Sequence, residues 1–363
     1  MVNNDFLSVY FYSVPNLRFL KFNQNYETLQ LKNTLKIKSG KDQKQVEVEN
    51  GIYNIYGTGG IIGHTNTFLY DKESVGIGRK GTIDKPVYFD QPFWTVDTLF
   101  YSEIYEGFIP KYIFYLFQTI NWKKYNTSTG VPSLTSSSIE NIEKSFPCYD
   151  EQLKVANFLT MIDMRIETQI KIINDYKILK NHIIKSFIKQ NGTSYLLSEI
   201  AELGRGRVIN SAEISKQKNP IYPVYSSQTS NNGIMGYLDN YDYEGEYITW
   251  TTDGANAGTV YYRNGKFNCT NVCGILKIKN GYDAYYISNI LNCYTKKYVS
   301  TNLANPKLMN NVMANIKINL PSIEQQKHSS KILQSIEYRV EIEEDIKLNL
   351  VKQKAFLLKN MFI

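Results

Sequence analysis

Histidine and cysteine are scarce in this sequence, which has only three His and four Cys among its 363 residues. The histidines lie far apart, so neither a Ser/His/Asp nor a Cys/His catalytic arrangement is indicated. Cys269, Cys273 and Cys293 could supply three ligands of a metal, but no fourth ligand lies nearby in the sequence. We therefore expect no metal site. Because the cysteines show no paired framework, we also expect free thiols in a reducing cytoplasm.

Long hydrophobic runs are also absent, since no apolar stretch approaches the roughly 20 residues that cross a bilayer. We expect a soluble protein without a membrane partner. The 41 Lys and Arg exceed the 34 Asp and Glu, and the resulting net charge of +7 permits a polyanionic partner without requiring one. Tyrosine and phenylalanine are frequent instead, with 29 and 17 copies, and we expect most of these rings in β-rich cores.

Motifs for catalysis and cofactor binding occur in this sequence only in incomplete form. Gly76-x-Gly78-x-x-Gly81 has the letters of a dinucleotide fingerprint, but strand-like residues follow where a helix should start, so we interpret it as a glycine-rich turn. Asn219–Tyr222 resembles an amino-methyltransferase motif but has Ile for its second Pro, and Asp42–Lys44 has no acidic partner for nuclease chemistry. The sequence predicts no catalytic centre in this chain.

One pattern occurs twice, roughly 174 positions apart, and so long a period predicts two homologous domains rather than a solenoid. Pro147–Gln152 and Pro321–Gln326 both read Pro-x3-[Glu/Gln]-Gln, and each precedes a helical run of about forty residues. Gly60–Gly63 likewise matches Gly233–Gly236. The expected segments are a leader (1–28), a first β-rich domain (29–149), a central long helix (150–191), a second β-rich domain (192–320) and a C-terminal long helix (321–363).

Both helical runs are amphipathic, because their apolar residues recur at spacings of mostly three, four or seven. At 1.5 Å per residue such a helix is about 60 Å long, more than one β-rich domain can cover. We therefore predict an α+β fold in which the long helices pack as an antiparallel coiled coil and separate two homologous heads related by a pseudo-twofold axis. The alternative is that each helix folds back onto its own domain. The residues expected in the coiled coil are Ile162, Ile166, Ile173, Ile183, Ile336, Val340, Ile346, Leu350 and Leu357.

Cationic and polar residues gather near the start and in the loops of each predicted domain. Glycines alternate with the cations, which lets a backbone approach a phosphate chain while the side chains neutralise it. The expected phosphate contacts are Lys38, Lys41, Arg79, Lys80, Arg205, Arg207 and Lys307.

Base-edge contacts are expected from the polar loops. Asn, Gln and Arg can make bidentate contacts with base edges, and the hydroxyl groups of Ser and Thr can bind different bases. The expected base readers are Thr58, His64, Ser227, Gln228, Asn231, Asn232, Asp253 and Asn256. Ordinary turn chemistry is the alternative for any one of them. The two halves match in their scaffold and differ in these loops, as expected of two readers of different sequences.

These features resemble the specificity subunit of type I restriction-modification systems. The resemblance covers essentially the whole chain and rests on the opening Val14–Phe19, the Leu-Ser-Glu-Ile start at Leu197, both Pro-x3-[Glu/Gln]-Gln motifs and the paired long helices. Glu151 in the first motif departs slightly from the Gln of the second copy, and no consequence is expected.

The resemblance implies two target-recognition domains, each reading one part of a split, asymmetric sequence in double-stranded DNA, with the helices setting the spacing. It also implies two methyltransferase subunits, which use S-adenosylmethionine, and restriction subunits, which use ATP and Mg. This chain is then expected to be non-catalytic, to hold no cofactor and to act in cytoplasmic host defence. Two alternatives stay open: a two-headed protein- or glycan-binding scaffold, and a stand-alone DNA-modifying enzyme.

Overall fold

The structure is a computed structural model that describes residues 15–300 and 305–363. Val14 and the first half of the predicted leader lie outside the described residues. The chain forms two compact units, one with the residues up to Ile170 together with Asp345–Ile363, the other with Lys171–Glu344. Each unit therefore contains parts of both long helices, α3 (Tyr149–Ile188) and α8 (Ile323–Met361). We call the part of each unit outside these helices its head. The five-segment division of the sequence stays a prediction.

The first head is built from two four-stranded sheets and one short strand pair. The strand orders are β2-β9-β6-β7, β3-β5-β4-β8 and β1-β10. Its elements are β1 (Glu27–Gln30), β2 (Leu35–Ser39), β3 (Glu47–Val48), β4 (Tyr53–Gly57), β5 (Gly60–Thr65), β6 (Ser74–Gly78), β7 (Val87–Phe89), β8 (Phe93–Thr95), β9 (Leu99–Ile104), α1 (Pro110–Thr119), α2 (Ser136–Glu140) and β10 (Glu143–Phe146).

Helix α1 carries the centre of the first head's core. Its buried residues recur at helical spacing and share one face, and they are Tyr112, Ile113, Tyr115, Leu116 and Phe117. That face packs with strand residues such as Ile77 and with apolar residues of α3 in one cluster.

The second head contains a six-stranded sheet, of order β12-β17-β15-β16-β13-β14, and the pair β11-β18. A Cβ on Gly274 would lie only 2.2 Å from Cζ2 of the buried Trp250, so this strand position requires glycine. The elements are β11 (Thr193–Leu196), α4 (Leu197–Ile200), β12 (Ala201–Arg205), α5 (Ser211–Ser215), β13 (Tyr222–Tyr225), β14 (Ile234–Leu238), β15 (Tyr243–Thr251), β16 (Val260–Cys269), β17 (Cys273–Ile278), α6 (Ala284–Tyr294), α7 (Asn310–Ala314) and β18 (Lys317–Leu320).

Both heads share an unusual strand connection. In the first, the antiparallel hairpin β4–β5 joins β8 in parallel, and in the second the hairpin β13–β14 joins β16 in parallel. Each hairpin also has a register shift in its first strand. The prediction of two homologous β-rich heads is therefore confirmed.

The repeated Pro-x3-[Glu/Gln]-Gln motif is a structural clip at the start of each long helix. In the first unit Gln152 accepts a hydrogen bond from the backbone N–H of Ile109 (3.1 Å) and donates one to the carbonyl of Pro147 (3.0 Å). Gln326 makes the same two bonds in the second unit, with the backbone N–H before α6 (3.1 Å) and the carbonyl of Pro321 (2.8 Å). Both amides are buried, so each clip ties a long helix to the helix of its own head.

The position where the two motifs differ does have a structural consequence. Glu151 is buried and binds Arg18 through two hydrogen bonds, of 2.9 Å and 2.7 Å, and also accepts one from Tyr26 (3.1 Å). The exposed Gln325 occupies the equivalent position in the second unit and accepts a bond from the N–H of Ser322. Glu151 thus anchors the segment before β1, whereas the element before β11 in the second unit is the end of α3.

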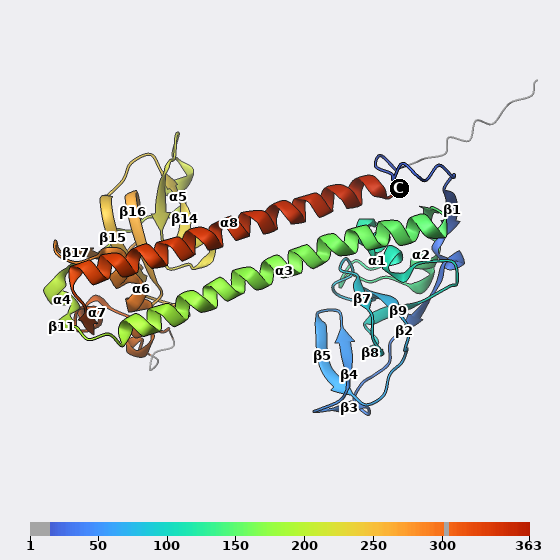
Figure 1. Cartoon of the computed structure of the whole chain (residues 1–363), viewed down its shortest axis with the longest axis horizontal. Coiled ribbons are helices and arrows are strands. Elements are labelled where there is room, and N and C mark those ends of the chain that lie inside the picture. Colours follow the sequence, from blue (N-terminus) through green and yellow to red (C-terminus); the bar gives the residue numbers. More distant parts are fainter. Residues whose placement is uncertain (1–14, 301–304) are drawn as a thin grey trace, which may run out of the picture. The chain divides into compact units, whose positions relative to one another are not determined.

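The long helices lie side by side and antiparallel within each unit (Figure 1). Lys354 of α8 pairs with Asp163 of α3 in the first unit, at 2.6 Å. Lys177 pairs with Glu344 in the second unit, at 2.7 Å, and Lys180 pairs there with Glu337. In the second unit the residue numbers of these pairs rise along α3 and fall along α8, so the two helices run antiparallel. The predicted α+β fold class with an antiparallel helix pair is confirmed.

The apolar stripes of the helices differ in how deeply they are buried. Ile162, Ile173 and Leu350 are buried, whereas Ile346 is 40% exposed. The partly buried members are Ile166, Ile183, Ile336, Val340 and Leu357.

The ends of the helices enter the cores of the heads. Met361 and Phe362, at the end of α8, belong to the core of the first head. Ile184 and Phe187, near the end of α3, belong to the core of the second head. The alternative that each helix folds back onto its own domain is therefore wrong for these ends. The end of α3, which follows the first head in the sequence, packs in the second head, and the end of α8, which follows the second head, packs in the first.

Candidate nucleic-acid interface

A cationic pocket of about 280 Å³ lies in the first head, after strand β6. Arg79 and Lys80 line it together with the hydroxyl groups of Ser39, Ser133 and Thr135. Arg79 donates a hydrogen bond to the carbonyl of Asp97 (3.4 Å), and neither cation forms an ion pair within the part of the chain that the structure describes. Two unneutralised cations among hydroxyl groups have the chemistry that binds a phosphate.

Backbone contacts link the two chain segments that line this pocket. Lys80 forms a short bridge with Ser133, and the N–H of Gly81 donates to the carbonyl of Pro132 (2.9 Å). Gly81 has φ +86, a conformation that glycine adopts without strain. A Cβ on Gly81 would lie 4.0 Å from Oγ1 of Thr58, so the turn of hairpin β4–β5 lies beside this loop.

The second head repeats this backbone arrangement with different side chains. Asp253 forms the bridge with Lys307, and the N–H of Gly254 donates to the carbonyl of Pro306 (3.0 Å). Gly254 also has a positive φ, of +95. By this correspondence Asp253 stands where the first head has Lys80, and Lys307 stands where it has Ser133.

The side chains at this second site form a mixed-charge cluster. Oδ1 of Asp253 lies 3.4 Å from Nζ of Lys307, and its Oδ2 lies 3.9 Å from Nη2 of Arg205. Three residues predicted from the sequence thus come together here. The carboxylate offsets one of the two cations, so this site attracts an anion less than the first head's pocket does.

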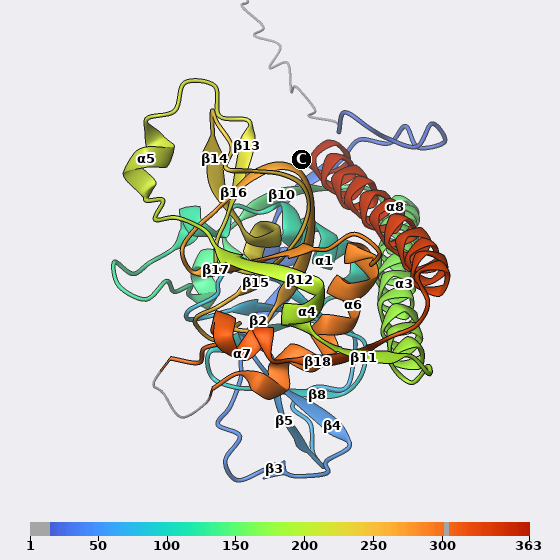
Figure 2. The same ribbon diagram turned by 90° about the vertical axis from the view of Figure 1, so that its left-hand side faces the viewer.

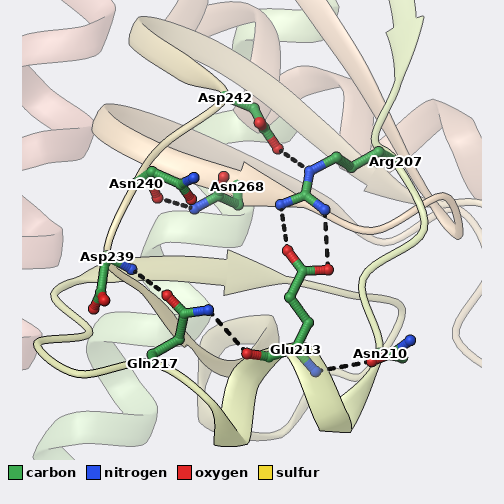
Figure 3. A network of polar contacts seen from close by, with 8 residues as sticks. All are labelled: Arg207, Asn210, Glu213, Gln217, Asp239, Asn240, Asp242 and Asn268. Atoms are coloured by element: carbon green, nitrogen blue, oxygen red, sulfur yellow. Dashed lines mark hydrogen bonds and ion pairs between the residues drawn. The ribbon is translucent and has the colours of Figure 1, made fainter.

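Arg207 already has two carboxylate partners (Figure 3). Its guanidinium binds Glu213 through two hydrogen bonds, of 2.7 Å and 3.1 Å, and Asp242 through Nε at 3.0 Å. The hydrogen bonds from Arg207 lower the pKa of Glu213. This arrangement fixes α5 beside the hairpin β13–β14 (Figure 2). Arg207 therefore has a structural partner set that the sequence did not indicate, and its phosphate contact stays a prediction.

The network extends along the segment that contains α5. Asn210 caps the helix by accepting from the N–H of Glu213 (2.8 Å), and Gln217 donates to the carbonyl of Glu213 (2.9 Å). Asp239 accepts the backbone N–H groups of Lys218 and Asn219, at 3.0 Å and 2.8 Å. The N–H of Asp239 also donates to Oε1 of Gln217 (3.0 Å), so this segment is joined to the turn after β14 (Figure 3).

Four of the predicted base readers lie on the loop between β13 and β14. Ser227 and Gln228 are partly buried, whereas Asn231 and Asn232 are exposed. Gln228 donates to the carbonyl of Ile234. The predicted reader Asn256 reaches this loop from another turn, because its side chain donates to Oγ1 of Thr229 (3.1 Å).

The remaining predicted residues of the first head are less gathered. Lys38 on β2 pairs with Glu103 of β9 at 3.3 Å, and both side chains are about one third exposed. Lys41 and His64 are exposed, the latter on β5. Their contacts with nucleic acid stay predictions.

Arg263 is a further residue at this loop that the sequence did not indicate. It lies on β16, is only 4% exposed and donates from Nη2 to the carbonyl of Asn232 (2.9 Å) in the loop just described. Burial lowers the pKa of its guanidinium. The available signal was an arginine inside a strand-like, tyrosine-rich run, Val260–Arg263, where a buried charge is uncommon.

A shallow apolar groove of about 480 Å³ runs between the long helices of the first unit. Met161, Met164, Ile346 and Leu350 line it, and both methionines are more than half exposed. Exposed apolar surface of this kind is typical of a protein-binding site.

No cluster of His, Cys, Asp and Glu within 15–300 and 305–363 could hold a metal ion. No helix in those ranges is long and apolar enough to cross a membrane. All four cysteines are free.

Comparison with known proteins gives consistent matches. The family model described as Type I restriction modification DNA specificity domain matches twice, at residues 23–175 and 191–353. A putative type I specificity subunit of Mycoplasma pneumoniae, S.MpnORF365P, is 36% identical over 224 residues, which are 59% of this chain and 82% of the relative. The type I restriction enzyme MpnII specificity subunit of the same organism is 42% identical over 146 residues, or 40% of this chain and 43% of the relative.

Among solved structures, one example matches over nearly the full length of the chain. The type I restriction-modification S subunit from M. genitalium gives a TM-score of 0.67 at 18% identity, covering 97% of this chain and 99% of the other. The likeness shows a shared fold.

Proposed function

The chain belongs to the family of type I restriction-modification DNA specificity subunits, and from that premise we propose that each head reads one half of a split DNA sequence. The resemblance seen in the sequence is confirmed, and the chain is a DNA-specificity subunit. The observation that carries the two-part reading is that both heads build the same backbone site and fill it differently. Lys80 and Ser133 in the first head correspond to Asp253 and Lys307 in the second. Two such sites recognise different base pairs.

In the first head, Arg79 and Lys80 neutralise a backbone phosphate, and the surrounding hydroxyl groups donate hydrogen bonds to its oxygens. Thr58, on the neighbouring turn, contacts a base edge. In the second head Arg205 and Lys307 contact phosphate. Asp253 and the loop residues Gln228, Asn231, Asn232 and Asn256 read bases, since a carboxylate accepts from the amino group of cytosine and an amide pairs with adenine.

The long helices set the distance between the two half-sites and bind the partner subunits. The apolar groove of the first unit is the docking place for a methyltransferase subunit, because its exposed methionines adapt to an apolar partner. Restriction subunits complete the complex. S-adenosylmethionine, ATP and Mg are used by those partners, and this chain supplies recognition without catalysis, in the cytoplasm where the DNA lies.

The proposal is tested by selecting bound duplexes from a pool of random double-stranded DNA with the full-length chain and sequencing them. The expected result is an enriched motif of two short, different parts at a fixed spacing. Affinity for that motif should weaken steeply as the salt concentration rises. A pool without enrichment, or with one continuous motif, would contradict the proposal.

A further inference from the structure

Arg263 is a buried cation on strand β16. It is 4% exposed, and no ion pair of Arg263 exists within the described ranges. Its guanidinium carbon lies 3.6 Å from the ring centre of Tyr225 and 4.4 Å from that of Tyr261. The two rings stabilise the charge through cation–π contact. Burying a charge without a carboxylate partner costs free energy of folding. The hydrogen-bond partners of the guanidinium therefore indicate what the buried charge is for.

The guanidinium supports the loop between β13 and β14. Nε donates to Oγ1 of Thr249 (3.2 Å) at the base, and Nη2 donates to the carbonyl of Asn232 (2.9 Å) in the loop. A Cβ on Gly233 would lie 3.2 Å from the same Nη2, so the loop backbone passes directly over the guanidinium.

The supported part of the loop has an uncommon backbone. Asn231 (φ 49), Asn232 (φ 53) and Gly233 (φ 80) are consecutive left-handed residues, and the two asparagines are the only non-glycine residues with positive φ in the described ranges. Side chains disfavour this conformation, and asparagine tolerates it better than most. Such a run persists only where its surroundings fix it, and it is typical of functional loops.

We infer that Arg263 is the positioning residue of the second head's reading loop, fixing the left-handed turn so that Asn231 and Asn232 meet the bases of one half-site in a single geometry. This inference rests on the proposed function. Arg263 itself is too buried to touch DNA, so it acts through the Asn232 carbonyl. Its planar fork bonds Thr249 and Asn232 at once, and lysine, with one ammonium group, cannot reproduce that geometry.

The test uses the full-length chain and the random-duplex selection described above, with Arg263→Lys as the main variant. We expect the preference for the correct base over other bases to fall about tenfold in one half of the enriched motif, which corresponds to the loss of one base contact. The other half, and the affinity for random DNA, should be unchanged. Lys266→Met is the matched control, since Lys266 is an exposed cation on the same strand, and it should leave the motif intact.

A second variant distinguishes an effect of the loop side chains on base reading from an effect on the stability of the second head. Replacing Asn231 and Asn232 by glycine keeps the backbone conformation and the Asn232 carbonyl but removes both side chains. It should lose discrimination at the same motif positions, and adding Arg263→Lys to it should change the motif no further.

Two results would overturn the inference while leaving the proposed function in place. One is a wild-type motif that survives Arg263→Lys unchanged. The other is a loss of affinity for every sequence together with a lowered melting temperature, which indicates a purely structural role. A wild-type chain that enriches no two-part motif removes the proposed function and this inference with it.

Discussion

At the scale of single residues, the first head's cationic pocket determines how DNA affinity depends on salt. We predict that changing Arg79 and Lys80 to Met lowers the slope of log affinity against log salt by about 1 to 2, because each phosphate contact contributes roughly 0.9. The measurement is the affinity for the enriched duplex between about 50 and 200 mM salt. Lys123→Met is the control, an exposed lysine of the same head that pairs with Asp84. An unchanged slope would remove these two residues from the interface.

The Arg207 network should make α5 sensitive to acid. Because Arg207 depresses the pKa of Glu213, the ion pair stabilises the segment above the ordinary pKa of 4.5 and loses that contribution as pH falls through the lowered value. Hydrogen exchange of the α5 amides, corrected for intrinsic rates, should show lost protection below pH 4.5. Glu213→Gln should show weak protection at every pH. Protection of the wild-type segment that did not decline at any pH below 4.5 would contradict the prediction.

At the scale of elements, each long helix begins at a buried glutamine clip. Gln152→Ala leaves the N–H of Ile109 and the carbonyl of Pro147 without partners, and we expect a loss of about 2 kcal/mol in the free energy of unfolding of the first unit. Gln326→Ala should do the same to the second unit. Gln325→Ala, one residue away and exposed, is the control and should cost less than 0.5 kcal/mol, the usual range for surface changes. Urea unfolding followed with a probe in each unit measures both.

The helices are also expected to act as a ruler. Inserting seven residues after Ile170 and seven after Glu344 keeps the apolar stripe in phase, since a heptad is two turns of a coiled coil. Each helix then gains about 10 Å, and the gap between the half-sites should grow by about three base pairs. Selection from the random pool reads the new spacing. Insertions of two residues are the control, because they rotate the stripe away from its partner. A motif with the original spacing would contradict the ruler.

At the scale of the whole molecule, the first head depends on residues far away in the sequence. Met361 and Phe362 are buried in its core, so replacing both by Ala should destabilise that head by about 5 kcal/mol or more. Phe356→Ala is the matched control, since Phe356 lies on the same helix and is 58% exposed. Hydrogen exchange should show the loss in the first head and none in the second. Equal protection in variant and wild type would show that the core closes without α8.

The fold was largely predictable because its signals are local or repeated. The heptad-like spacing of Ile162, Ile166 and Ile173 indicates a helix without reference to any other residue. The recurrence of Pro147–Gln152 at Pro321–Gln326 indicates the duplication. The role of the glutamines in that motif was not predictable, because their partners, such as Ile109, lie about 40 residues away.

The candidate site was less predictable for the same physical reason. Arg207 looks like a free cation in the sequence, and only the fold brings Asp242 within 3.0 Å of it. Arg263 reads as an ordinary strand residue until β13 and β16 pair in parallel and place Tyr225 beside it. Burial and long-range partners decide which polar residues stay available, and neither is encoded in local spacing.

The division of the chain also bears on the order in which it folds during synthesis. The second unit is made of one continuous stretch, Lys171–Glu344, whereas the first combines residues that precede this stretch with residues that follow it. Domains usually mature in the order in which the ribosome releases them. Here the head translated first stays incomplete until Asp345–Ile363 has been synthesised, so the head translated later is the first to reach its native state.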